Sequence, residues 1–262
     1  VITMVGSKEK APAWSREQLK LAFHLYCQLP FGKLHSRNPE IIELAGVIGR
    51  TPGALAMKLV NFASLDPAIT GSGRVGLAGA SRLDREIWSE FSADWDGLTL
   101  ECDRLRRQLG AAPTVDEADE QLVPQDYSGE TRRVIAEQRI RQSFFRRAVL
   151  SSYGGRCCMS GVTEPQLLVA SHIVPWSRDK ANRLNPSNGL CLSALHDRAF
   201  DKGLISVADD YRVLVSARLL RSGNEFVVST FARLEGMQIE LPERFQPNPK
   251  FLARHRTEVF AG

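Results

Sequence analysis

The 262-residue sequence contains no hydrophobic run that approaches the ~20 apolar residues of a membrane-spanning helix. Residues 1–14 lack the basic-then-apolar pattern of a secretory signal peptide. Cysteine is scarce: the five residues are odd in number, irregularly spaced and contain no Cys-x-x-Cys pair. This pattern argues against a disulfide framework and against a four-cysteine structural zinc site. We therefore expect a cytoplasmic protein with no membrane partner.

The charge is unevenly distributed along a chain that is long enough for two domains. The formal net charge is +4, and 24% of the residues are charged. Residues 1–82 carry +5, residues 83–126 carry −8 and residues 127–262 carry +7. Two basic segments on either side of an acidic one are typical of a protein whose surfaces meet a polyanion. The acidic segment itself is more simply a solvated face.

The N-terminal segment is predicted to be helical. Ser15 and Gln18 form a capping-box pattern ahead of a first helix. Residues 39–62 predict two short helices joined by a Gly-containing turn, with Thr51 as the N-cap of the second. This helix-turn-helix outline would present Arg50, Lys58 and Asn61 to a DNA groove or to phosphates. An ordinary helical hairpin with a solvated face produces the same pattern, but the basic charge favours DNA contact.

The domain boundary is predicted from composition. Residues 66–82 are glycine-rich and predict a loop, and residues 83–109 predict an acidic helical stretch. An acidic segment without apolar periodicity follows and is typical of a linker. We predict an α+β protein with a helical domain over residues 1–112, a linker over 113–130 and a second domain over 131–262.

The second domain opens with the most basic stretch of the chain, residues 131–150, in which six arginines accompany one glutamate. Apolar residues at helical spacing would anchor this helix, while Arg139, Arg146 and Arg147 could reach phosphates. At the other end of the chain, residues 251–256 predict a basic helical tail. His255 in that tail could contact a phosphate, but we expect it to be a surface histidine.

The stretch from Val169 to Gly203 carries the candidate chemistry. An apolar run ending at His172 predicts a strand, and a polar loop containing Arg178 and Arg183 follows. Residues 190–192 predict a second strand, and Ser193 can cap a helix that carries His196. The two loop arginines are further candidates for DNA contact.

This stretch resembles the HNH endonuclease family, which has the ββα-metal fold. The resemblance lies in His172, Asn188 and His196 in this order, within Ala-Ser-His-Ile-Val-Pro-Trp, Asn-Pro-Ser-Asn-Gly-Leu and Leu-His-Asp-Arg-Ala-Phe-Asp-Lys-Gly. These segments are similar to those of bacterial restriction-type proteins. Separately, each residue would more often be a structural histidine, a turn asparagine or an exposed helical histidine.

The resemblance implies a role for each residue. His172 would be the general base that deprotonates water, since a neutral imidazole can do so near pH 7. Asn188 would hold the loop by hydrogen bonds to backbone, and His196 would bind a divalent cation. Many family members have Asp or His where this chain has Ser171, a poorer ligand for a hard cation. Ser171 could ligate weakly, Asp201 or Asp197 could assist, or waters and the substrate phosphate could complete the shell. Asp201 could equally bond backbone amides near Gly203.

The resemblance implies a metal-dependent DNA endonuclease that restricts foreign or modified DNA. Mg²⁺ or Mn²⁺ is the expected ion, and a histidine ligand also permits Ni²⁺, Co²⁺ or Zn²⁺. The partner is double-stranded DNA, and cutting both strands favours a homodimer. Two alternatives stay open: a homing or mobile-element endonuclease, and a non-catalytic DNA-binding regulator with a degenerate finger, which Ser171 supports.

Overall fold

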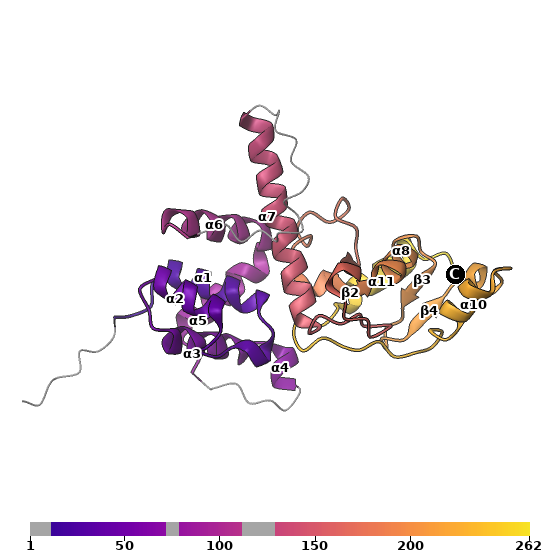
Figure 1. Ribbon diagram of the computed structural model, residues 1–262, viewed down its shortest axis with the longest axis horizontal. Helices are drawn as coiled ribbons and strands as arrows, with labels where there is room; N and C mark the ends of the chain where they lie inside the picture. The colour runs from indigo at the N-terminus through magenta and orange to yellow at the C-terminus, as the bar shows by residue number, and fades with distance from the viewer. Residues whose placement is uncertain (1–11, 72–78, 112–128) are drawn as a thin grey trace, which may run out of the picture.

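The computed structural model describes residues 12–71, 79–111 and 129–262. The N-terminal part is helical, as predicted (Figure 1). Its elements are α1 (Arg16–Gln28), η1 (Phe31–Lys33), α2 (Pro39–Val47), α3 (Pro52–Ala63), α4 (Pro67–Gly71), α5 (Arg82–Ala93) and α6 (Trp95–Gln108). No helix of the described segments is both long and apolar enough to cross a membrane.

The sequence sets most helix starts through capping residues. Ser15 and Gln18 form the predicted capping box at α1. Thr51 accepts a hydrogen bond from the Ala54 amide at the start of α3, with Pro52 in the first helical position. Ser81 likewise caps α5. These local bonds satisfy backbone amides that have no partner within the helix.

The core of the helical part forms around α1, which packs against α3, α5 and α6. Phe23 is fully buried and makes edge contacts with Phe62, Trp88 and Phe91 at centroid distances of 5.0, 5.0 and 4.7 Å. Edge-to-face packing of this kind stabilises a core beyond the burial of apolar area alone.

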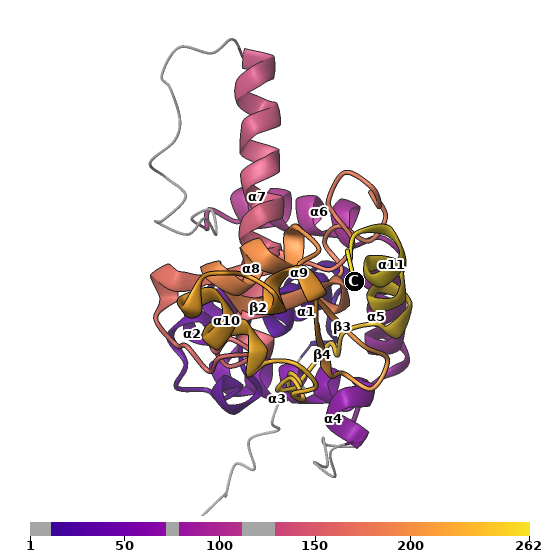
Figure 2. The same cartoon turned by 90° about the vertical axis from the view of Figure 1, so that its right-hand side faces the viewer.

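The long helix α7 (Gly129–Ser152) joins this bundle to the C-terminal part. It packs against α1 and α6 on one side and against β1 (Leu168–His172) on the other. Its first turns project beyond the rest of the described chain (Figure 2). Gly154 and Gly155, both with positive φ, follow the end of the helix.

The C-terminal part contains two small antiparallel sheets. β1 pairs with β2 (Gly189–Ser193), placing His172 opposite Gly189, and α8 (Ala194–Asp201) follows directly. β3 (Ile205–Val207) and β4 (Val213–Val215) pair as an antiparallel hairpin. The remaining elements are η3 (Pro165–Leu167), η4 (Pro186–Asn188), α9 (Ala217–Leu220), α10 (Glu225–Ala232) and α11 (Pro249–Glu258).

Three details differ from the sequence-based expectations. The segment 66–82, expected to be a loop, contains the short helix α4 and the first residue of α5. The stretch 83–109 is two helices, because Asp94 caps α6 through the Gly97 amide. His255 is not on the surface: the residue is 2% exposed, and its ring stacks on Phe200 and contacts Ser206 Oγ at 2.8 Å. Residues 112–128, most of the predicted linker, lie outside the described residues.

Candidate functional site

His172 occupies the last position of β1, where the sheet meets α7. Its ring stacks on Phe145 of α7 at a centroid distance of 3.9 Å and an interplanar angle of 8°, and Trp176 meets it edge-on at 5.5 Å. The ring also lines a pocket of about 470 Å³ together with Gln138, Gln142 and Arg146. One histidine face is therefore fixed by packing, and the residue borders open space.

The hydrogen bond of His172 selects its tautomer. Nε2 lies 2.9 Å from the backbone carbonyl oxygen of Arg183, an acceptor, so Nε2 carries the proton and donates. Nδ1 then presents its lone pair, and it has no hydrogen-bond partner among the described residues. Burial lowers the pKa of His172, against the opposing effect of the Arg183 carbonyl, which favours the neutral base.

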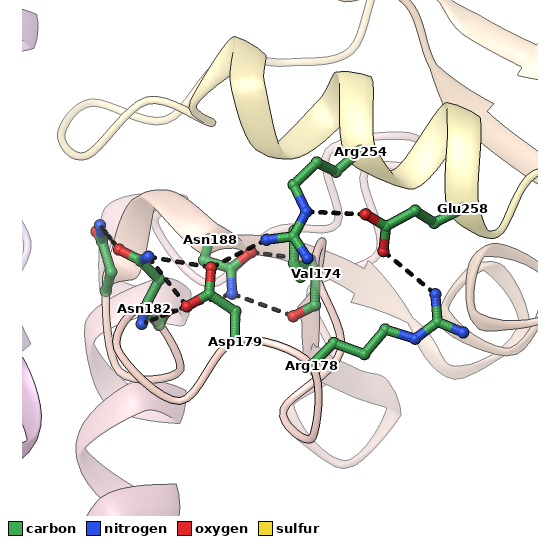
Figure 3. Close-up of polar contacts among 8 residues, drawn as sticks. Val174, Arg178, Asp179, Asn182, Asn188, Arg254 and Glu258 are labelled. Carbon is green, nitrogen blue, oxygen red and sulfur yellow. Dashed lines mark hydrogen bonds and ion pairs between the residues drawn. The ribbon is translucent and has the colours of Figure 1, made fainter.

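Asn188 holds the loop between the two strands. It is fully buried, and its Oδ1 accepts a hydrogen bond from the Val174 amide at 2.8 Å. Its Nδ2 donates to the carbonyl oxygens of Val174 and Asn182 at 3.2 and 3.3 Å (Figure 3). An amide side chain can make this bidentate contact because it carries both a donor and an acceptor. The predicted bonds of Asn188 to backbone are thus present.

Ion pairs fasten the same loop from outside. On α11, Arg254 donates to Asp179 at 3.1 Å and to Glu258 at 3.0 Å, and Arg178 donates to Glu258 at 3.3 Å (Figure 3). On the opposite side, the Arg183 guanidinium pairs with Asp96 of α6. The residue whose carbonyl fixes His172 is therefore itself attached to the helical part of the protein.

His196 is buried on α8, with 2% of the residue exposed. Its Nδ1 lies 3.2 Å from Ser193 Oγ and 3.6 Å from Cys157 Sγ. Burial alone would raise the pKa of Cys157, but hydrogen bonds from His196, Ser160 and backbone lower it to about 6. Where Nδ1 carries the proton, Nε2 presents its lone pair, which is the form that binds a cation.

Ser171 lies on the other face of β1 from His172 and beside Asp197 of α8. Its buried Oγ lacks a partner of full hydrogen-bond geometry among the described residues. Burial raises the pKa of Asp197, while the nearby Ser171 hydroxyl lowers it. Partial desolvation and the neighbouring charge of Asp197 raise the pKa of the more exposed Asp201. A hydroxyl and two carboxyl groups thus gather at α8.

These groups fit a hard cation in part. Within residues 12–71, 79–111 and 129–262, no group of three or more His, Cys, Asp and Glu side chains is arranged to hold a metal ion. The unpartnered Ser171 Oγ next to Asp197 nevertheless offers oxygen ligands, which Mg²⁺ and Mn²⁺ prefer. His196 contributes from the same helix only through Nε2, because its Nδ1 faces Ser193 and Cys157.

The helix-turn-helix candidates are mostly engaged within the protein. Lys58, expected at a groove, is 8% exposed, and its Nζ lies 3.0 Å from both carboxylate oxygens of the buried Asp84. Arg50 donates to the carbonyl oxygens of Pro12 and Ala13 at 2.7 and 2.6 Å and stacks over Trp14. The α2–α3 pair therefore does not present Lys58 to a ligand, and Asn61 is half-buried.

The candidate arginines of the C-terminal part divide in the same way. Arg146 donates to the carbonyl oxygens of Leu168 and Pro165 at 2.9 and 3.2 Å, and Arg147 pairs with Glu40. Arg178 and Arg183 hold the site loop, as described above. Of these five arginines, Arg139 and Arg146 have no ion pair among the described residues, and Arg139 also lacks the backbone contacts that hold Arg146.

Sequence reasoning missed the groups that orient the base. The Arg183 carbonyl and the Phe145 ring fix His172, and Asp96 fixes Arg183. A backbone carbonyl has no sequence signature, and Asp96 is 87 positions from its partner. The sequence shows Phe145 as an apolar residue of a basic helix, but it does not indicate that Phe145 stacks on His172.

The site thus consists of two antiparallel strands followed by a helix, with one histidine at the end of the first strand and another on the helix. Comparison with models of known families identifies residues 157–208 as an HNH endonuclease domain. This chain carries an HNH domain, which indicates nuclease activity on DNA, and HNH nucleases generally use divalent metal ions. No curated protein matches the chain.

Proposed function

We propose that the protein is a metal-dependent endonuclease that hydrolyses phosphodiester bonds of double-stranded DNA and restricts foreign or modified DNA. The observation that carries the chemistry is the orientation of His172. Its Nε2–H bonds to the Arg183 carbonyl, which leaves Nδ1 as a free base at the edge of a pocket. A general base needs this combination of a free lone pair and access to water.

His172 would remove a proton from the attacking water through Nδ1, while Asn188 keeps the loop in place. Because Phe145 and the Arg183 carbonyl prevent rotation of the imidazole, the base would meet the phosphate in one orientation. A divalent cation would be held by Asp197, Ser171 and His196, with Asp201 next to them. When bound, it supplies positive charge that offsets the charge on the phosphate and the leaving oxygen.

The test is cleavage of supercoiled plasmid, unmodified and cytosine-modified, in Mg²⁺, Mn²⁺ or Ni²⁺. We expect His172→Ala to reduce cleavage by about 100-fold or more, because general-base catalysis contributes ~10²–10⁴. His196→Ala should abolish cleavage in all three metals, because it removes a proposed metal ligand. The control is His35→Ala, an exposed histidine away from the site. Wild-type cleavage by a correctly folded His172→Ala variant would show that another group is the base.

A second candidate is a DNA-binding regulator with a degenerate finger. It is favoured by Ser171, and by the absence of a three-ligand His, Cys, Asp and Glu group from the described parts of the chain. It predicts gel-shift binding with no cleavage in any of the three metals. Cleavage lost in His196→Ala would exclude this candidate, and the preference for modified or unmodified plasmid would test the role in restriction. Sedimentation with duplex DNA would test the proposed homodimer.

A further inference from the structure

A second pocket, of about 630 Å³, lies between the helical part and the site loop. On one side the pocket is lined by α4, α5 and α6. On the other side it is lined by two separate segments, one around η4 and one at Phe245. Its volume is within the ~300–1,000 Å³ that small-ligand sites occupy. None of the groups assigned to catalysis borders it.

Three aromatic residues form part of the wall of this pocket. Trp88, Trp95 and Phe245 all line it, and Phe245 lies 6.4 Å from Trp88 and 5.9 Å from Trp95, ring centroid to ring centroid. The Phe245 ring is nearly parallel to Trp88 and perpendicular to Trp95, with interplanar angles of 22° and 88°. Phe245 also has a φ of +51°, a conformation that L-residues rarely adopt. A flat heterocycle is the ligand that such walls stack best.

Polar groups sit at the edge of the same pocket. Asp66 lines it, and its carboxylate accepts hydrogen bonds from Tyr26 Oη at 3.2 Å, from the Ala68 amide at 2.9 Å and from the Ile69 backbone. A carboxylate has about four acceptor sites, so it keeps capacity for a further donor. Asn185 and Gln246 add amide groups that both donate and accept. Aromatic faces with a few such edge groups suit a base taken out of its stack.

We propose that this pocket binds an unstacked nucleobase that carries an exocyclic amino group, with the rings stacking on it and Asp66 accepting from the amino group. This proposal rests on the proposed function, since it names a base-reading site of the same nuclease. The pocket wall is also part of the site loop: Asn185 and Ser187 border it, and Asn188 fixes Val174. An occupied pocket therefore braces the loop that orients His172.

The test measures the binding of short single-stranded oligonucleotides by fluorescence anisotropy, in buffer without divalent metal. Oligo-dC and oligo-dA are compared with oligo-dT and with an abasic oligonucleotide of equal length and charge. We expect the amino-bearing bases to bind about tenfold or more tightly than the abasic strand, since base stacking on aromatic side chains has this size. Oligo-dT should fall between them.

Ser92→Phe supplies the variant that fills the pocket from its rim. Ser92 lines the pocket, is exposed and bonds only the Trp88 carbonyl one turn earlier on α5. Ser89→Phe is the matched control, because Ser89 is an exposed serine on the same helix with the same bond to a carbonyl, that of Arg85. We expect Ser92→Phe to lower oligo-dC binding to the abasic level and Ser89→Phe to bind like wild type, with both circular dichroism spectra unchanged.

Equal binding of the abasic and base-containing strands by wild type would overturn the proposal, as would equal binding by the two phenylalanine variants. Displacement of oligo-dC by tetramethylammonium, but not by sodium at equal ionic strength, would also overturn it by showing an ammonium cage. Plasmid cleavage by wild type separates this outcome from the nuclease assignment. Cleavage without base-dependent binding leaves the nuclease and removes the pocket, while base-dependent binding without cleavage does the reverse.

Discussion

At the scale of single residues, the pair of Lys58 and Asp84 shows how a predicted DNA contact can be a structural one. Asp84 is fully buried and also accepts from the Ser81 amide at 2.7 Å, so both charges are committed inside the fold. A buried ion pair that loses one member leaves an uncompensated charge. We expect Lys58→Met to lower the free energy of unfolding by about 3–5 kcal/mol, measured by urea denaturation.

The control for Lys58→Met is Arg82→Met on the same helix as Asp84. Arg82 is exposed and pairs with Glu86 one turn later, so its loss should cost about 1 kcal/mol or less. The opposite result for Lys58→Met, weaker DNA binding with unchanged stability, would restore its predicted place at a DNA surface.

His255 makes the stability depend on pH. Burial lowers its pKa to about 4, whereas a histidine in the unfolded chain titrates near 6.5. As the pH falls from 6.5 towards 4, the unfolded chain binds a proton and the folded protein does not, so stability is lost. The loss is at most about 1.4 kcal/mol per pH unit.

The measurement is urea denaturation between pH 7 and pH 4.5 for wild type and His255→Gln. Carboxyl groups with raised pKa values, such as Asp66, act in the opposite direction, so only the comparison isolates the histidine. We expect the variant to be less stable at pH 7 and to lose less stability on acidification. An identical slope for both proteins would show that His255 is not buried in its neutral form.

At the scale of elements, α7 combines an anchoring face with a basic one. Arg146 fixes the chain that enters β1 through two carbonyl oxygens, whereas Arg139 has no ion pair among the described residues. We expect Arg146→Ala to cost about 1–3 kcal/mol of stability. Arg139→Ala should leave the thermal midpoint unchanged and reduce the slope of log K against log salt for DNA binding by about one.

Each of these two variants is the control for the other, since both replace an arginine of α7 with alanine. If Arg139→Ala bound DNA with the wild-type salt slope, the face of α7 that carries the half-buried Arg139 would not meet phosphates. If Arg146→Ala were as stable as wild type, its contacts to β1 would not contribute to folding.

The elements were largely predictable from local signals. Capping residues such as Ser15 and Thr51 mark helix starts, and the two apolar runs around the polar loop became β1 and β2. The division at Asp94 was missed, because an aspartate inside an acidic helical pattern gives no periodicity change. The orientation of His172 was not predictable, since it depends on a carbonyl and an aromatic ring supplied by other segments.

At the scale of the whole molecule, the apolar core continues through α7. Phe144, Phe145 and Val149 belong to the same buried cluster as Phe23 and as Leu190 of β2. Separating the helical part from residues 131–262 would expose these side chains to water. The two predicted domains therefore differ in composition but share one core. Whether each of them folds independently is a separate question.

Urea unfolding answers that question. Three of the four tryptophans, Trp14, Trp88 and Trp95, report on the helical part, while far-UV circular dichroism reports on the whole chain. Because the core is shared, we expect the two signals to give one coincident transition. Two separated transitions, or a fragment of residues 131–262 that folds alone, would instead support independent domains.

The contacts of Arg183 indicate which parts of the chain must stay together when the site is transferred to another protein. Its carbonyl orients His172, its side chain is tied to Asp96, and Arg254 braces the same loop through Asp179. The matched segment, residues 157–208, includes His172 and Arg183 but neither Asp96 nor Arg254. Transplanted into an unrelated scaffold, it would bring its chemical groups and leave their supports behind. The segment needed to orient His172 is thus longer than the segment that the family model matches. A chimaera should therefore include both α6 and α11, with its junctions before α6 and after α11.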